Sequence, residues 1–356
     1  MSSRAIPTFF LLSALLLSSC ALPSGEPPAA EPSQRQFFAM NTLMTLQVTG
    51  AESEDALSAA VEEVNRLDRL FSRRQAESDI ARLNAHAGDG TDVPLSPETT
   101  ELLSIALEET SATAGAFDVT VAPVIDAWGF GTGDAGQYRL PSEGELEALL
   151  PLVDRAALHV DAAQNTARLD RSGMEVDLGG IAKGYTADRL VELLGEYDVS
   201  SALLNLGSST ITLVGNNPSG QPWRVALKDP QDEEQQILLL SLSDQALSTS
   251  GAYEQHFEEN GVTYHHILDP RTGYPAQTGI LSVTVVSDNG ARADALSTAL
   301  FVAGPEQALE LWRADDSFEC VLCLEDGRIL ITQGLENQFL YNEEDSHGYT
   351  CEIVRR

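Results

Sequence analysis

Apolar and polar residues follow two different rhythms along the chain. Three stretches repeat apolar residues three or four positions apart, and this spacing predicts helices that pack one face against a core. The apolar positions are Leu57, Val61, Val64, Leu67 and Phe71 in the first helix, Leu102, Leu103 and Ala106 in the second, and Ala187, Leu190, Val191 and Leu194 in the third.

Shorter apolar runs, separated by turn residues, predict many strands. We expect strands at 157–160, 166–169, 174–178, 201–205, 210–214, 223–228, 236–242, 262–267 and 280–287. Asn260-Gly261 predicts a hairpin turn before the strand at 262–267. Because the strands cluster instead of alternating with helices, the pattern predicts an α+β fold with substantial antiparallel sheet and packing helices.

The cysteines at 320 and 323 form a Cys-x-x-Cys pair in a segment that alternates as a strand does. Asp326-Gly327 then predicts a turn into a second strand. Residues three apart on a strand face opposite sides of the sheet, so the two thiols point away from each other. We therefore expect buried or half-buried thiols rather than a zinc site, since no second ligand pair follows.

The first residues are typical of an export signal. Arg4 precedes an apolar stretch at 6–17 that is too short to span a bilayer as a mature helix. Leu17-Ser18-Ser19-Cys20 resembles a bacterial lipobox, which predicts a signal peptide at 1–19 and a lipidated Cys20. The protein would then be anchored in the bacterial cell membrane, facing outside the cytoplasm. An ordinary secretory signal is the alternative.

After the signal, residues 20–36 are rich in Pro, Ser, Ala and Glu, which predicts a flexible tether. No later linker divides the chain, so we expect one folded domain at 37–345 and a C-terminal tail at 346–356.

Composition narrows the classes of partner. The chain has 356 residues, of which 43% are hydrophobic, enough for a sizeable core. Its formal net charge of −33 repels polyanions, so we expect no nucleic-acid partner. An anionic substrate would need local positive charge from a metal ion, a few basic residues or a helix N-terminus.

A glycine-rich junction at 175–184 leads from a predicted strand into the third helix. Glycines there allow a ligand to approach the backbone, and the N–H groups of a first helical turn favour phosphate. Lys183 would lie in that turn. The spacing matches neither a Walker A loop nor a dinucleotide fingerprint. A phosphate site and a tight packing turn both remain open.

Asp294 and Thr298 are four residues apart in the predicted helix 291–304, so they share a face. A carboxylate and a hydroxyl are oxygen ligands that suit magnesium. The alternative is that Asp294 caps the helix and Thr298 is a half-buried helix residue.

Two adjacent histidines lie in the stretch "YHHILDPRTGYP" at 264–275. Alternation along the strand makes His265 and His266 diverge, so they cannot easily clamp one metal ion. His266 titrates near neutrality and is a candidate general base, with Asp269-Pro270 and Gly273-Tyr274-Pro275 fixing a rigid loop behind it. A histidine that is merely solvated at a strand end is the alternative.

Nine segments in order resemble the successive motifs of the ApbE family, the FAD:protein FMN transferases. They are "FFAMNT", "FSRRQAESDIARLN", "GAFDVTVAPVIDAWGFG", "DLGGIAKGYTAD", "NLGSS", "WRVALKDP", "STSGAY", "HHILDPRTGYP" and "ADALSTALFVAG". The match covers nearly all of residues 37–335, and it implies an ApbE-like fold related to the T-fold.

The resemblance also implies a reaction and a set of site residues. The reaction is magnesium-dependent transfer of FMN from FAD to a threonine or serine hydroxyl of a target protein, with AMP leaving. By position, His266 would be the base, and Gly180, Asp294 and Thr298 would hold Mg²⁺. The FAD contacts would be Met40, Ala116, Phe117, Asp118, Asp177, Lys183 and Leu268.

The sequence departs from the family's usual residues at several positions. Asn41 stands where the family usually has Gly, and Ser208-Ser209 stands where the family commonly has Gly followed by Asp, Asn or Glu. Ala252 replaces an Asp, and Arg74 stands where an aromatic residue is frequent. An arginine also stacks on a ring plane. These departures concern FAD affinity, not the base or the metal ligands.

Two other functions compete with transfer. A hydrolase would use water in place of the protein hydroxyl and release FMN and AMP, and a flavin carrier would bind FAD without reaction. For the transferase, the implied acceptors are extracytoplasmic flavoproteins, such as subunits of sodium-pumping or electron-transfer complexes.

Overall fold

The structure, a computed structural model, describes residues 31–132, 134–341 and 347–356. The predicted signal peptide, Cys20 and most of the predicted tether lie outside the described residues. In the part that is described, no helix is both long enough and apolar enough to cross a bilayer.

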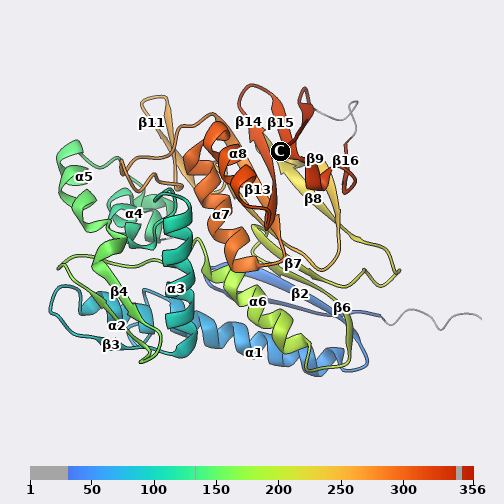
Figure 1. Ribbon diagram of the computed structural model, residues 1–356, viewed down its shortest axis with the longest axis horizontal. Coiled ribbons are helices and arrows are strands. Elements are labelled where there is room, and N and C mark those ends of the chain that lie inside the picture. Colours follow the sequence, from blue (N-terminus) through green and yellow to red (C-terminus); the bar gives the residue numbers. More distant parts are fainter. Residues whose placement is uncertain (1–30, 133, 342–346) are drawn as a thin grey trace, which may run out of the picture.

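A nine-stranded sheet forms the centre of the molecule (Figure 1). Its strands, in spatial order, are β1 (Ser33–Ala39), β2 (Thr42–Gly50), β6 (Val199–Leu206), β7 (Thr210–Val214), β10 (Ala246–Gly251), β13 (Ile280–Ser287), β14 (Phe318–Leu324), β15 (Arg328–Thr332) and β17 (Thr350–Val354). Neighbours pair antiparallel except β15 and β17, which pair parallel. The first and last strands of the chain therefore form the two edges of the sheet.

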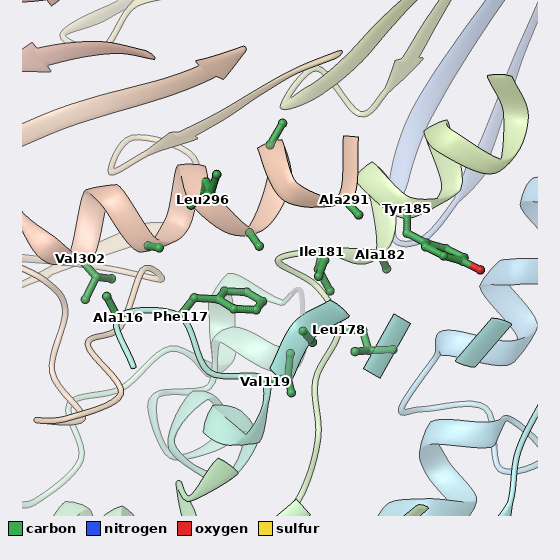
Figure 2. Packing of buried hydrophobic residues seen from close by; sticks show 14 of the residues in the cluster. Ala116, Phe117, Val119, Leu178, Ile181, Ala182, Tyr185, Ala291, Leu296 and Val302 are labelled. Atoms are coloured by element: carbon green, nitrogen blue, oxygen red, sulfur yellow. The ribbon is translucent and has the colours of Figure 1, made fainter. Parts of the chain in front are cut away.

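Helices cover one face of this sheet. They are α1 (Ser53–Phe71), α3 (Pro97–Ala112), α6 (Ala182–Leu194), α7 (Gly290–Ala303) and α8 (Pro305–Ala314). Apolar side chains of α1 and α6 share a core with β2 and β6, and those of α3 and α7 share another with β13 and β14. Figure 2 shows part of the second core, with Leu296 and Ala291 of α7 above Phe117 and Ile181.

The opposite face of the large sheet packs on a small sheet of β8 (Trp223–Asp229), β9 (Asp232–Leu242) and β16 (Phe339–Leu340). Alternation along β14 sends Cys320 into the helix-side core and Cys323 into the core between the sheets. The prediction that these thiols are buried and face opposite sides is confirmed, and both are free.

The remaining elements build one end of the molecule beside the helices (Figure 1). They are α2 (Asp79–Ala85), α4 (Ala122–Trp128), α5 (Glu143–Leu149), the three-stranded sheet of β3 (Val93–Pro94), β5 (Thr166–Leu169) and β4 (Leu158–Asp161), and the hairpin β11 (His256–Glu259) and β12 (Val262–His265). Asn260-Gly261 forms the turn of that hairpin, as its sequence predicts.

The predicted strand at 174–178 is wrong, because this segment belongs to no sheet. The Asn84 side chain takes the place of a neighbouring strand: its amide donates to the Val176 carbonyl and its oxygen accepts from the Val176 N–H. The predicted strand at 262–267 ends instead at His265, and the His266 N–H donates to the Gln255 carbonyl. Val191, expected on the buried face of α6, is 37% exposed.

The described strands extend beyond both predicted domain boundaries. The domain was expected to begin at residue 37, but β1 begins at Ser33, where it pairs with Val48 of β2. The predicted tail at 346–356 contains β17, whose Cys351 lies opposite Ile329 of β15. The strand TCEIV is only five residues long, so its partner is visible only in the fold.

Candidate functional site

A cavity of about 630 Å³ lies between the helices, the segment 177–183 and the β11–β12 hairpin. Its size is in the usual range for small-ligand sites. Apart from Cys20, every site residue expected from the sequence lines it: Met40, Ala116, Phe117, Asp118, Asp177, Gly180, Lys183, His266, Leu268, Asp294 and Thr298. Residues separated by more than 250 positions thus meet in one place.

The glycine-rich junction forms one wall of the cavity. The Gly179 N–H donates to Asp177 Oδ1 at 2.6 Å, and Lys183 Nζ donates to the Gly179 carbonyl at 3.2 Å. A Cβ added to Gly180 would lie 3.2 Å from the Phe117 ring and 3.6 Å from Thr298 Oγ1. Gly180 therefore keeps the backbone close to both side chains, beside the Phe117 ring seen in Figure 2.

Asp294 is buried in α7 and holds three segments together. Its Oδ2 accepts from the Gly184 N–H at 3.0 Å, and its Oδ1 accepts from Ser248 Oγ at 2.9 Å and Thr210 Oγ1 at 3.3 Å. The alternative that Asp294 caps the helix is wrong, because Asn289 is the N-cap and accepts from the Arg292 N–H.

The oxygen atoms around Asp294 fit a magnesium ion. Each carboxylate oxygen offers two lone pairs, so Oδ2 retains one beyond its bond to Gly184. Thr298, one turn along α7, adds a hydroxyl that lies 3.3 Å from Ser250 Oγ. With the Gly180 carbonyl, this is a set of three oxygen donors with one carboxylate. Mg²⁺ commonly binds so few protein oxygens and completes its shell with water and substrate phosphate.

His266 and His265 diverge, as the alternation of the strand predicts. His265 is buried, with Nε2 3.0 Å from the Ala276 carbonyl oxygen and its ring against Phe301. His266 Nδ1 lies 3.3 Å from the Gln255 carbonyl oxygen. A neutral ring beside a carbonyl carries its proton on Nδ1, which leaves Nε2 as the acceptor.

Burial, together with the nearby His265 and Lys183, lowers the pKa of His266 to about 4. The neighbouring carbonyl of Gln255 opposes this shift. The imidazole is therefore neutral at ordinary pH, the form that accepts a proton. Burial also raises the pKa of Asp118, whose carboxylate accepts from the Thr120 N–H and hydroxyl.

A rigid loop follows His266. The Asp269 N–H donates to the Tyr274 carbonyl at 2.8 Å, and Arg271 pairs with the Asp269 carboxylate. Gly273 adopts a φ of +75°, and its carbonyl accepts from the Trp128 indole at 2.7 Å. The loop is thus tied to α4, which supports the prediction that prolines and glycine fix its shape.

Two departures from the family pattern fall where the backbone has a positive φ. Asn41 has a φ of +59° and Ser208 one of +67°, so the left-handed conformation is retained where glycine is usual. Asparagine tolerates that conformation better than serine does. Ala252 packs against the main core, and Arg74 lines the cavity and donates to the Gly131 carbonyl.

Sequence reasoning missed Arg73, whose side chain is only 9% exposed in the cavity wall. It pairs with Asp126, Glu175 and Asp177. The sequence shows only a pair of arginines, and nothing in it indicates that three distant carboxylates converge on one of them.

A model of the ApbE family matches residues 40–322. The chain belongs to the ApbE family. It is 33% identical over 318 residues to the FAD:protein FMN transferase of Treponema pallidum (strain Nichols), covering 85% of this chain and 87% of that protein. It is 32% identical over 322 residues to the enzyme of the same name from Klebsiella pneumoniae (strain 342), covering 86% and 90%.

Solved ApbE structures share the fold. The ApbE protein from Thermotoga maritima superposes with a TM-score of 0.79 at 32% identity, covering 86% of this chain and 99% of that one. The apo form of the Pseudomonas stutzeri flavinyl transferase ApbE gives 0.73 at 29% identity, covering 83% and 91%. The predicted ApbE-like α+β fold is confirmed.

Proposed function

We propose that this ApbE-family protein transfers FMN from FAD to a serine or threonine hydroxyl of another protein. The hydroxyl oxygen attacks the phosphorus of the FMN half, a new P–O bond forms, the bond to the AMP half breaks, and AMP leaves. The observation that carries the proposal is the convergence of His266, Lys183 and the Gly180, Asp294 and Thr298 oxygens on one cavity.

His266 would accept the proton of the attacking hydroxyl at Nε2. Its low pKa keeps this nitrogen unprotonated, and the Gln255 carbonyl holds the tautomer. A base of low pKa is weak, so its contribution depends on close alignment with the hydroxyl. The aromatic ring of Phe130 lies edge-on to His266, with 6.5 Å between the ring centroids, and limits the orientations that the imidazole can take.

Lys183 would meet the diphosphate at the start of α6, where the N–H groups of the first turn also face anions. Asp294, Thr298 and the Gly180 carbonyl would hold magnesium, which supplies positive charge to the diphosphate when bound. This local charge would allow an anionic substrate to bind a protein with a net charge of −33.

The rest of the FAD molecule would extend along the cavity wall. Met40, Leu268, Ala116 and Phe117 offer apolar surface, while Asp118 and Asp177 offer carboxylate oxygens to a hydroxyl or amine. Such a mixture of apolar lining and a few polar groups is usual in cofactor sites.

The proposal is tested by incubating the full-length protein with FAD, Mg²⁺ and candidate acceptor domains, and by following AMP and acceptor mass. AMP together with an acceptor heavier by FMN supports transfer, and a chelator should stop both. AMP and free FMN without adduct across several acceptors would indicate hydrolysis. Intact bound FAD would indicate a carrier.

We further propose that Cys20 carries a lipid anchor and that the acceptors are flavoproteins outside the cytoplasm, such as subunits of electron-transfer or sodium-pumping complexes. The lipobox-like Leu17-Ser18-Ser19-Cys20 supports this location. Labelling of the wild type with a radioactive fatty acid, and loss of label in Cys20→Ser, is the expected result. An unlabelled wild type would favour an ordinary secretory signal.

A further inference from the structure

Arg73 lies in the cavity wall, at the meeting point of three segments. Nη1 and Nη2 donate to the two oxygens of Asp126 at 2.7 Å and 2.5 Å, and Nε lies 2.7 Å from Asp177 Oδ2. Nη1 also lies 3.4 Å from Glu175 Oε2. The guanidinium therefore links α4 to the extended segment that leads into the glycine-rich junction.

Asp177 connects Arg73 to that junction. Asp177 uses Oδ2 for Arg73 and Oδ1 for the Gly179 N–H at 2.6 Å, so its carboxylate is held at both oxygens. Gly179 in turn accepts from Lys183, and the next residue is Gly180. A displacement of Asp177 would thus move the residues that face the diphosphate.

The charges explain why the arginine is needed there. Asp126, Glu175 and Asp177 bring three carboxylates to one arginine whose side chain is 9% exposed. Burial and the nearby Asp126 raise the pKa of Glu175, while Arg73 and Arg74 lower it. Without Arg73, these carboxylates would face one another in a partly buried place. The repulsion between their like charges would push them apart.

Gly131 gives independent evidence that this arrangement is specific. A Cβ on Gly131 would lie 2.0 Å from Arg73 Nη2 and 2.5 Å from Asp126 Oδ1. No larger residue fits there without moving the ion pair. The backbone beside the arginine is therefore shaped around the Arg73–Asp126 contact.

We propose that Arg73 is a positioning residue of the FAD site, which acts through Asp177 and sets the position of the glycine-rich junction. This inference rests on the proposed function and adds a specificity-determining contact to it. Four of the five N–H donors of Arg73 face carboxylate oxygens, so it shapes the site chiefly through these carboxylates and not by offering its charge to the diphosphate.

The experiment compares Arg73→Met, Asp177→Asn and the double variant in the full-length protein. FAD affinity is measured by equilibrium dialysis, KM and kcat by AMP release, and stability by thermal unfolding. We expect Arg73→Met to raise both Kd and KM for FAD by about tenfold or more, the effect of losing one charged hydrogen bond. The double variant should bind FAD no more weakly than the weaker-binding of the two single variants, because the two residues act in series.

Two further variants separate positioning from general stability. Arg73→Lys should restore part of the affinity, since an ammonium keeps the charge but not the forked geometry. Arg66→Met is the matched control, because Arg66 also pairs with two carboxylates, Glu63 and Glu98, but does not line the cavity. It should lower the melting temperature without changing the KM for FAD.

Unchanged FAD affinity in Arg73→Met, or losses that add in the double variant, would overturn the inference while leaving the proposed function intact. If Arg73→Met does not fold, Arg73→Lys with Asp177→Asn carries the same test. A wild-type protein that does not bind FAD at all would overturn both the proposed function and the inference.

Discussion

His266 is the residue whose removal best separates binding from reaction. It lines the cavity, and among the described residues its side chain makes one polar contact, to the Gln255 carbonyl, so loss of the imidazole leaves the cavity wall intact. We expect His266→Ala to bind FAD within about threefold of the wild type and to lose a hundredfold or more in turnover, the usual range for a general base. Dialysis and AMP release measure the two quantities. Preserved transfer would remove His266 from the mechanism.

The same histidine predicts an unusual pH profile. An ordinary histidine is protonated below about pH 6.5, but burial lowers the pKa of His266 to about 4, with contributions from His265, His256 and Lys183. Between these two pH values the buried ring stays neutral and remains a base. We therefore expect kcat/KM to be nearly flat from pH 7.5 to about pH 5 and to fall only near pH 4. A fall centred near pH 6.5 would contradict the lowered pKa.

The depressed pKa of His266 also affects folding. The unfolded chain binds the proton below about pH 6.5 and the folded chain only near pH 4, so the unfolded state holds more protons in between. This contribution to the free energy of unfolding is complete above about pH 6.5 and is lost as the pH falls toward 4. Wild type should therefore lose more stability than His266→Gln between pH 7 and pH 5 in urea titrations.

At the scale of single residues, the sequence predicts which residues line the cavity but not which hydrogen bonds and ion pairs hold them there. Order and type of motif identify His266, Lys183 and Asp294, and all three line the cavity. The bonds of Asp294 to Thr210 and Ser248 come from strands that the sequence does not place next to α7. Arg73 escaped notice for the same reason, since its partners are 53 to 104 residues away.

Helices α6 and α7 meet at two glycines, and this contact sets the position of both site helices. A Cβ on Gly184 would lie 2.0 Å from the Gly290 carbonyl oxygen and 2.8 Å from Asp294 Cβ. We expect Gly184→Ala to lower the free energy of unfolding by about 1–3 kcal/mol, the typical cost of overpacking. Urea unfolding measures it.

Gly144 provides the matched control for this prediction. It lies in helix α5, and a Cβ there would have no atom within 4 Å. Gly144→Ala should leave stability unchanged or raise it by up to about 1 kcal/mol, because alanine is the better helix former. Equal losses in the two variants would show that the α6–α7 contact is not tight.

Asp188 joins the same helices by a different contact. Its carboxylate accepts from the Gly290 and Ala291 N–H groups at the first turn of α7, at 2.7 Å and 2.9 Å. Asp188→Ala leaves two N–H groups without these acceptors, so we expect a loss of about 1–3 kcal/mol. Asp188→Asn should lose less, since its amide oxygen still accepts; equal losses would argue against this bonding role. Chemical unfolding of both variants is the measurement.

Whole elements were predicted well where periodicity is long. The apolar positions from Leu57 to Phe71 repeat over about four turns, and the helix that they predict is α1. The segment 174–178 has the composition of a strand, but its partner is the Asn84 side chain, which no local pattern shows. β17 escaped prediction because an edge strand of only five residues carries little signal.

At the scale of the whole molecule, β17 forms one edge of the large sheet and covers the strand beside it. β17 covers the edge of β15, whose residues Ile329, Leu330 and Ile331 are buried. A chain ending at residue 345 would expose this apolar strand and its unpaired backbone groups, which favours self-association. We expect it to melt at a lower temperature and to form oligomers by size-exclusion chromatography.

A chain ending at Val354 is the control for that truncation. It keeps β17 and loses only two residues. Arg356 lies over the Trp312 ring and 3.9 Å from Glu319, and Arg355 pairs with Glu336 at the surface. Exposed pairs of this kind contribute little. Monomeric behaviour of both shortened chains would contradict the sealing role of β17.

Under the proposed lipid anchor at Cys20, the start of β1 at Ser33 would limit how far the enzyme reaches from the membrane. Thirteen residue steps separate Cys20 from Ser33, and a fully extended chain of that length spans at most about 45 Å. With a lipid on Cys20, the cavity would operate within a shallow layer above the bilayer. Acceptors whose hydroxyl lies higher than this layer, plus the breadth of the enzyme itself, would escape modification however well they fit the site.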